Sequence, residues 1–468
     1  MHHIRGVPRE QVALLPPAID DYVSGDHPVR VVDAFVGSLD LAALGFERVS
    51  TEATGRPPYH PADLLKLYMY GYLNRIRSSR MLERECERNV EVMWLLGQLR
   101  PDFKTIANFR KENGQALRGV CGAFVRFCQR QGLVGGETLA IDGSKFAAAA
   151  SQKNGAVTAA HIDRSIKEVD ARIERYLTEL DQNDAAEQEP TLAMATAATL
   201  EALREERGRL QALAEEMIAA GQTRIVPGEP EATLMGREPR VIGYNVQTAV
   251  DAQHKLIVHH EVVREANDRR QLHPVASGAK QVLESERLQV VADSGYHNAE
   301  QAQKCEDEQI EPAVPSQRSS NQYGGYFPKD AFTYDEQQDT YRCPAGAVMK
   351  VRPSSKDNRR RRYLTNACGS CELRPQCTSG RRRQITRSVA EDAAERANER
   401  ARDPNVMRRR SGLVEHPFAW LKRTLNGRFL SRGLANAKAE IALAITAFNL
   451  LRVMKVIGTR RLLNLMLA

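Results

Sequence analysis

The sequence lacks any long uninterrupted apolar run. A helix that crosses a bilayer needs about 18 or more predominantly apolar residues, and the nearest candidate, residues 441–451, is too short and has charged residues on both sides. We expect this segment to form a buried amphipathic helix instead. The N-terminal residues also lack the apolar stretch of a secretory signal. These two absences predict a cytoplasmic protein that has no membrane partner.

Acidic residues are the minority among the charged side chains. The 59 Asp and Glu residues face 67 Lys and Arg residues, which gives a formal net charge of +8. A basic balance favours a polyanionic partner such as nucleic acid, although many basic proteins bind none. The excess of Lys and Arg is concentrated in residues 350–410. We favour an interpretation in which this stretch binds DNA phosphates, and a solvated basic surface is the alternative.

Cysteine is scarce and unevenly placed. Four of the 8 cysteines are scattered, as expected of buried free thiols, and the other four are Cys343, Cys368, Cys371 and Cys377. In a cytoplasmic protein such a cluster suggests metal before disulfides. Four thiolates could close a structural Zn²⁺ site, but a zinc ribbon would carry two C-x2-C pairs and only one is present here. A thiol cluster without metal is the alternative.

Residues 1 to about 25 are predicted to form a polar arm, and the sequence from residue 28 to about residue 132 follows a helical pattern. Pro61 suits the first position of a helix, and further helices are predicted at residues 90–99, 104–113 and 117–131. A basic helical module of this kind can bind duplex DNA as a helix-turn-helix does, and a packing or dimerisation domain fits the pattern equally well. Residues 159–220 are predicted to form an antiparallel helical hairpin with a structural or subunit-contact role, because apolar residues keep a spacing of three to four.

Two apolar strands are each followed by an aspartate and then a glycine. Residues 139–141 lead into Asp142 and Gly143, and residues 288–292 lead into Asp293. A strand hairpin at 241–263 and a helix are predicted between them, and this order is that of an RNase H-like core. A carboxylate at a strand end can project into a cleft that holds an oxygen-liganded metal. Asp142 taken alone could equally cap a turn.

A third carboxylate, Glu415, precedes Lys422 by seven residues. The two side chains share a helix face and lie about 10 Å apart along the axis, which suits a metal ligand next to a phosphate-binding lysine. An ordinary amphipathic helix with a charge pair is the alternative. Pro417 would remove a hydrogen bond from a helix interior, so we expect the helix to start near Leu413.

Together these motifs resemble the DDE transposases of bacterial insertion sequences, which have an RNase H-like catalytic core. The resemblance covers nearly the whole chain. It is carried by the motifs at residues 58–61, 103–110, 141–145, 243–247, 292–296 and 414–418, together with Lys422. In this family a Tyr and an Arg usually precede the Glu; here Met407 occupies the Tyr position and Arg410 the Arg position.

The resemblance implies an α+β fold in which a mixed RNase H-like sheet is flanked by helices. Residues 1–132 would form a helical DNA-binding or multimerisation domain. Residues 133–315 would form the first part of the catalytic core, with the hairpin 159–220 inserted. Residues 316–400 would be a basic Cys-rich insertion, and residues 401–468 would complete the core with C-terminal helices.

The resemblance also implies a chemistry. Asp142, Asp293 and Glu415 would converge within a few ångströms and bind two Mg²⁺ (or Mn²⁺) ions for DNA cleavage and strand transfer, while Lys422, Arg410 and Arg409 would bind the DNA. The partners would be double-stranded DNA, both the terminal inverted repeats and the target, and a second subunit in a homodimer at the bacterial nucleoid. Two alternatives stay open: a nuclease that performs no strand transfer, and a catalytically idle DNA-binding derivative.

Overall fold

A six-stranded mixed sheet organises the middle of the chain in the computed structural model. Its strands are β1 (Thr138–Ala147), β4 (Thr233–Met235), β5 (Val241–Asp251), β6 (Ile257–Val263), β7 (Leu288–Val291) and β8 (Ile310–Ala313). The order is β4-β5-β1-β7-β8, and β6 also pairs with β5. β5 runs antiparallel to β1, β4 and β6, whereas β1, β7 and β8 are parallel to one another. The predicted strands and the predicted α+β class are confirmed.

The structure describes most of the chain. The described residues are 17–50, 57–150, 155–184, 190–219, 221–236, 240–317, 325–352 and 360–468. Three helices pack against the main sheet. α9 (Leu272–Leu283) contacts β6, β5 and β1, and α10 (Ala299–Asp307) contacts β8. α13 (Pro404–Leu425) contacts β1, β5 and β7. The first 16 residues of the predicted N-terminal arm lie outside the described part of the chain.

The N-terminal region is helical, as predicted. It contains η1 (Ile19–Tyr22), α1 (Pro28–Gly37), α2 (Pro61–Leu73), α3 (Ser79–Arg88), α4 (Val90–Leu95), α5 (Phe103–Glu112) and α6 (Gly114–Arg130). Local capping explains two of the starts. The His60 side chain accepts a hydrogen bond from the backbone of Ala62 ahead of α2, and the Asp102 side chain accepts hydrogen bonds from Lys104 and Thr105 ahead of α5.

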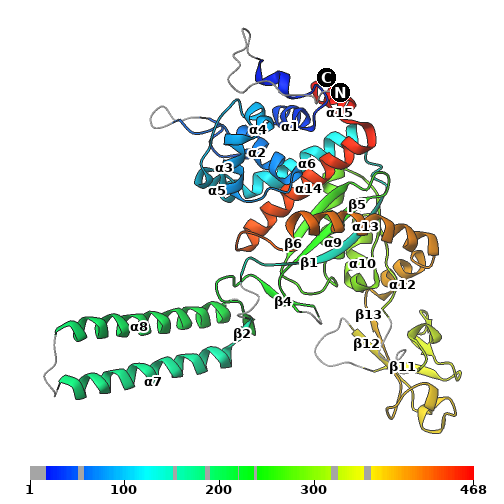
Figure 1. Cartoon of the computed structure of the whole chain (residues 1–468). Coiled ribbons are helices and arrows are strands. Elements are labelled where there is room, and N and C mark those ends of the chain that lie inside the picture. Colours follow the sequence, from blue (N-terminus) through cyan, green and yellow to red (C-terminus); the bar gives the residue numbers. More distant parts are fainter. Residues whose placement is uncertain are drawn as a thin grey trace, which may run out of the picture.

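The long helix α14 (Leu434–Ile457) joins the N-terminal helices to the sheet. It packs against α2, α5 and α6 on one side and against β6 on the other, as Figure 1 shows. The expected buried helix at 441–451 is confirmed. It is not amphipathic, however, because two layers cover α14 and residues on all its faces are buried. Among the described helices no single one is long and apolar enough to cross a membrane, although α14 and α15 (Thr459–Leu467), bent by 109°, reach that composition when taken together.

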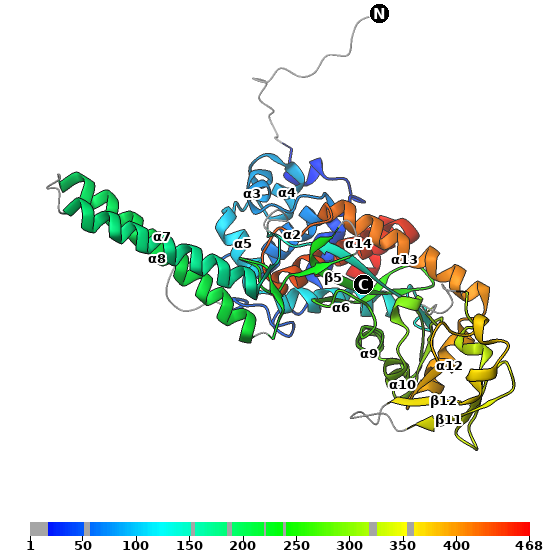
Figure 2. The same cartoon turned by 90° about the horizontal axis from the view of Figure 1, so that it is seen from below.

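The predicted helical hairpin is confirmed. α7 (Ala159–Asp184) and α8 (Pro190–Ala219) pack along each other, and β2 (Val157–Thr158) pairs with β3 (Arg224–Ile225) at their base. Near this base the hairpin has a small core of its own around Ile162, Met217 and Ile225. Figures 1 and 2 show the hairpin projecting away from the sheet.

A second, smaller sheet was not predicted from the sequence. Its antiparallel strands are β9 (Thr333–Asp335), β10 (Thr340–Arg342), β11 (Val348–Arg352), β12 (Arg360–Leu364) and β13 (Gln384–Ser388). The 3-10 helices η3 (Lys329–Ala331), η4 (Ala367–Ser370) and η5 (Arg374–Gln376) flank these strands, and α12 (Glu391–Arg400) follows. Its core contains Tyr341, Met349, Tyr363 and Ile385. In both views this sheet lies on the opposite side of the main sheet from the hairpin.

Candidate active site

Asp142 lies in the middle of β1, where the sheet opens along one edge of the strand. β5 pairs with β1 from Leu139 to Ala147, but β7 pairs with it only as far as Ala140. The strand predicted at residues 139–146 is thus confirmed, and Asp142 ends only its apolar part, because the hydrogen bonds to β5 keep β1 extended beyond it. The change from apolar to polar residues at this point marks the end of the pairing with β7 instead. The Asp142 side chain is 25% exposed.

Asp293 follows β7, the parallel neighbour of β1. It is the N-cap of the 3-10 helix η2 (Ser294–Tyr296), and its Oδ1 accepts a hydrogen bond from the backbone N–H of Gly295 at 2.8 Å. Because β7 is short, this turn begins beside the open edge of β1. The charge of Asp293 acts on Asp142, so the structure brings these two predicted carboxylates together.

The electrostatics of Asp142 are unusual for an aspartate. Its pKa is raised from 3.8 to about 6, and burial is the largest cause. The backbone N–H of Gly143 and the guanidinium of Arg410 lower the pKa of Asp142, whereas the charges of Asp293 and Asp268 raise it further. Burial, more than the neighbouring charges, therefore disfavours the charged form of Asp142. Carboxylates perturbed in this way are concentrated at functional sites.

Arg410 brings a positive charge to Asp142 from α13. Its Nη1 lies 3.6 Å from Asp142 Oδ2, and the Arg410 side chain is 15% exposed. Two of its buried nitrogens, Nε and Nη1, have no hydrogen-bond partner within the described part of the chain. Buried polar groups normally have a hydrogen-bond partner, so this guanidinium has N–H groups available to donate to a further acceptor. Its neighbour Arg409 is exposed.

The helix that carries Glu415 starts earlier than predicted. Its first residue is Pro404, ahead of which the Asp403 side chain accepts a hydrogen bond from Asn405 N at 2.9 Å. The expectation of a start near Leu413 is therefore wrong, since a capped proline start pre-organises the first turn well before it. Pro417 lies inside the helix and is buried. Its lost hydrogen bond is tolerated because the ring contributes to the packed face.

Glu415 and Lys422 are both exposed on α13. The buried residues of the helix, among them Val414 and Leu421, occupy a different face. In the ranges that the structure describes, no three His, Cys, Asp or Glu side chains lie close enough together to hold a metal ion. The structure thus gathers Asp142, Asp293 and Arg410, and it does not bring Glu415 into a metal-binding group with them.

Asp268 is an acidic residue of this site that the sequence reasoning missed. It lies between β6 and α9, and its Oδ1 accepts hydrogen bonds from Asn245 Nδ2 at 2.8 Å and from Gln247 Nε2 at 2.6 Å. Both amide side chains come from β5, next to β1. The available signal was positional: Asp268 follows the strand β6 shortly before a helix, much as Asp293 follows β7.

The four clustered cysteines are brought together by the smaller sheet and its 3-10 helices. Cys343, Cys368, Cys371 and Cys377 all line one cavity of about 310 Å³. Burial raises the pKa of the Cys377 thiol, Arg383 opposes this, and the other three cysteines raise it further. The cavity is therefore shared by four thiols, although they too form no metal-binding group in the described ranges.

Two family models match the chain. Residues 17–112 match a family described as "Transposase domain (DUF772)", and residues 226–450 match the "Transposase DDE domain". Among solved structures the chain is similar to the piggyBac transposase synaptic complex with hairpin DNA, with 10% sequence identity, a TM-score of 0.35, and coverage of 94% of this chain and 79% of that one. Comparison with the curated proteins finds no match.

Proposed function

Since the chain belongs to the DDE transposases of insertion sequences, we propose that it cuts DNA at the ends of an insertion sequence and transfers those ends to a target. The observation that carries this proposal is the meeting of Asp142 and Asp293 where β7 leaves β1, with Arg410 of α13 beside them. Carboxylates at such a place suit metal-dependent phosphodiester chemistry.

The main sheet would be an RNase H-like core. The strand order supports this: β6, β5 and β1 are antiparallel neighbours, and the parallel strands β7 and β8 extend the sheet beyond β1. α9 connects β6 to β7. In this arrangement one predicted carboxylate lies on β1 and another follows the end of β7. The pairing of these two strands makes the carboxylates neighbours although they are far apart in the sequence.

Carboxylate oxygens are the ligands that Mg²⁺ and Mn²⁺ prefer, so the donor set at Asp142 and Asp293 fits either ion chemically. A bound metal pair would supply an activated water or 3′-hydroxyl and would stabilise the leaving oxygen. We propose Glu415 as the third ligand. Because Glu415 is exposed and stands apart from the two aspartates, its participation requires α13 to shift when DNA binds.

Arg410 would hold the scissile phosphate. Its Nε and Nη1 groups, which have no hydrogen-bond partner among the described residues, are donors of the planar kind that bind phosphate oxygens in pairs. Lys422 and Arg409, both exposed on the same helix, would bind backbone phosphates on either side. These contacts would orient the phosphate against the carboxylates.

The remaining parts would serve DNA recognition and assembly. The basic N-terminal helices would bind the terminal inverted repeats, and a homodimer would pair the two ends of the element before joining them to target DNA. We also propose that Cys343, Cys368, Cys371 and Cys377 hold a structural Zn²⁺, since tetrahedral thiolate sites suit this metal. Metal analysis of the purified chain tests the zinc proposal: about one zinc per chain is expected, with loss of zinc in Cys368→Ser. Zinc-free wild-type protein would contradict it.

The central test is Asp142→Asn in the full chain. Cleavage is assayed in Mg²⁺ with DNA that contains the sequences flanking the coding region on both sides. We expect cleavage to fall by about 100-fold or more, because the metal loses a charged ligand, while end binding stays nearly intact. Asp163→Asn on the exposed side of α7 is the matched control and should cleave normally. Retained cleavage in Asp142→Asn would overturn the assignment. Cleavage without joining by the wild type would indicate a nuclease, and binding without cleavage an idle derivative.

A further inference from the structure

The cations of the predicted basic stretch divide between the two faces of the smaller sheet. One face is packed: Tyr341 pairs with Met349, Tyr363 pairs with Ile385, and all four side chains are buried. We call it the core face. Because successive side chains of a strand point to opposite sides of a sheet, the residues adjacent to these four lie on the other side. The place of each Lys or Arg relative to this core therefore decides its surroundings.

On the core face two arginines oppose each other, and carboxylates compensate them. Arg361 of β12 lies directly across from Arg387 of β13, and like charges in such positions destabilise a sheet. Asp339 forms an ion pair with Arg361 at 2.9 Å. Asp392 and Glu395 both pair with Arg387. Carboxylates of the chain itself therefore neutralise the positive charge on this side.

Four cations lie together on the other side of the sheet, and we call these four residues the basic face. Lys350 and Arg352 belong to β11, and Arg360 and Arg362 belong to β12. Arg362 is half-buried and the other three are exposed. The strands that the structure describes place one carboxylate on this side, that of Asp335. It lies on the edge strand β9, and β10 separates it from the four cations. The positive charge is therefore continuous over two adjacent strands.

The basic face also places two arginines opposite each other. Arg352 lies directly across from Arg362, and Lys350 and Arg360 extend the positive charge along the same two strands. Within the described ranges, however, Lys350, Arg352 and Arg360 form no ion pair with a carboxylate. Like charges arranged in this way repel one another, and a polyanion that lies across the sheet would remove the repulsion. The contrast with the core face therefore points to a partner outside the chain.

We propose that the basic face binds the phosphate backbone of duplex DNA. A duplex carries one negative charge about every 1.7 Å along its axis, so cations on two adjacent strands can neutralise several phosphates together. In both views of the molecule the smaller sheet lies beyond the main sheet as seen from the N-terminal helices (Figures 1 and 2). The basic face would thus hold a stretch of duplex other than the one that those helices bind. This inference rests on the proposed function, to which it adds a second, sequence-independent contact with DNA.

The salt dependence of DNA binding by the full chain tests this inference. Fluorescence anisotropy with a labelled duplex of unrelated sequence gives the binding constant at each salt concentration. Arg352→Gln should reduce the slope of the log–log plot by about 0.9, the change expected for one lost phosphate contact. The triple variant Lys350→Gln, Arg352→Gln, Arg360→Gln should reduce it by about 2–3. Arg361→Gln is the matched control: it removes one charge from β12, but from a residue that pairs with Asp339, and it should keep the wild-type slope.

A wild-type slope in the folded triple variant would overturn the inference. Circular dichroism establishes folding, and if the triple variant is unfolded, a wild-type slope in Arg352→Gln overturns the inference instead. The weakening should be equal for duplexes with and without the terminal repeats, because backbone phosphates carry no sequence information. A loss confined to one sequence would contradict a backbone contact. A triple variant that binds DNA normally but no longer self-associates in sedimentation would assign the basic face to a second copy of the chain.

The two proposals fail in different ways. A wild-type chain that cuts DNA while the triple variant keeps the wild-type slope would overturn only the role of the basic face. A wild-type chain whose salt dependence falls in the triple variant but which cuts no DNA would overturn only the proposed function. Wild-type protein that binds no DNA would overturn both.

Discussion

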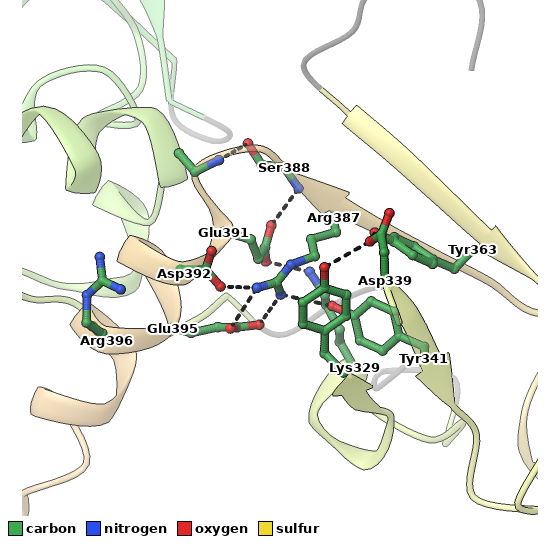
Figure 3. Close-up of polar contacts among 12 residues, drawn as sticks. Lys329, Asp339, Tyr341, Tyr363, Arg387, Ser388, Glu391, Asp392, Glu395 and Arg396 are labelled. Carbon is green, nitrogen blue, oxygen red and sulfur yellow. Dashed lines mark hydrogen bonds and ion pairs between the residues drawn. The ribbon is translucent and has the colours of Figure 1, made fainter. Parts of the chain in front are cut away.

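Two arginines that pair with carboxylates show how differently this chain uses the same chemistry. Arg387 of β13 is 5% exposed and donates to the Tyr341 hydroxyl, Asp392 and Glu395. Its guanidinium also lies over the ring of Tyr334, 3.8 Å from the centroid. Figure 3 shows this network at the junction between the smaller sheet and α12. We call it the Arg387 junction.

Arg410 has almost the opposite environment. It is also largely buried, but it meets Asp142 at 3.6 Å, and two of its nitrogens have no hydrogen-bond partner in the described ranges. An unmade hydrogen bond at a buried group costs about 1–3 kcal/mol. A completed network stabilises a fold, whereas an incomplete one keeps its donors available for a ligand. The comparison therefore separates an arginine whose contacts hold the fold together from one that we propose binds a phosphate.

The largest effect is expected at the incomplete site. Arg410→Ala should lower DNA cleavage by about 100-fold, the usual loss when a donor to a reacting phosphate or oxyanion is removed, and it should change the free energy of unfolding little. Cleavage kinetics and chemical denaturation measure the two effects. Arg409→Ala, the exposed neighbour on the same helix, is the control and should change cleavage only a few-fold. Normal cleavage by Arg410→Ala would remove the distinction between the two arginines.

The complementary change is Arg387→Met. It should destabilise the folded chain by about 2–3 kcal/mol, towards the low end for a broken buried pair because Asp392 and Glu395 are partly exposed and can be hydrated. Cleavage by the folded fraction should stay normal. Denaturant unfolding provides the measurement, and Arg361→Met is the control, since its surface pair with Asp339 is worth about 0–1 kcal/mol. Equal destabilisation by both variants would contradict the structural role.

A smaller effect concerns how the stability of the fold depends on pH. The carboxylates of the two sites should change this stability in opposite directions. Burial raises the pKa of Asp142 to about 6. Burial also raises the pKa of Glu391, beside the Arg387 junction, but Lys329 and the backbone N–H of Ser388 outweigh it and leave that pKa lowered. The stability that Asp142 contributes is present below about pH 4 and is lost as the pH rises through 6. The stability from Glu391 is present above its unfolded pKa and is lost as the pH falls.

At pH 8 in EDTA we therefore expect Asp142→Asn to be more stable than the wild type, by about 1–2 kcal/mol after allowance for its partial exposure, and Glu391→Gln to be less stable. Both differences should shrink towards pH 4. Thermal unfolding across this range provides the measurement. A loss of stability in Asp142→Asn at pH 8 would show that the acidic site carries no electrostatic cost.

The amino-acid pattern reveals part of the site because part of its signal is local. The transition from apolar residues to Asp-Gly or Asp-Ser-Gly is visible at Asp142 and Asp293, and both lie where β7 leaves β1. Asp268 carries no comparable signal, since its position depends on hydrogen bonds from Asn245 and Gln247, which come from another segment of the chain. The smaller sheet was missed because its short strands lie among basic and cysteine residues that obscure their alternation.

The sequence by itself determined the helices, the strands of the main sheet and the family, because periodicity, capping residues and motifs are properties of neighbouring residues. Only the tertiary structure decided that β7 stops pairing with β1 at Ala140, that α13 starts at Pro404 and that Glu415 is exposed. It also decided that Arg387 donates to three side chains, whereas Nε and Nη1 of Arg410 have no hydrogen-bond partner in the described ranges. These outcomes depend on pairings between segments far apart in the chain, and no local pattern encodes which polar atoms are left without a partner.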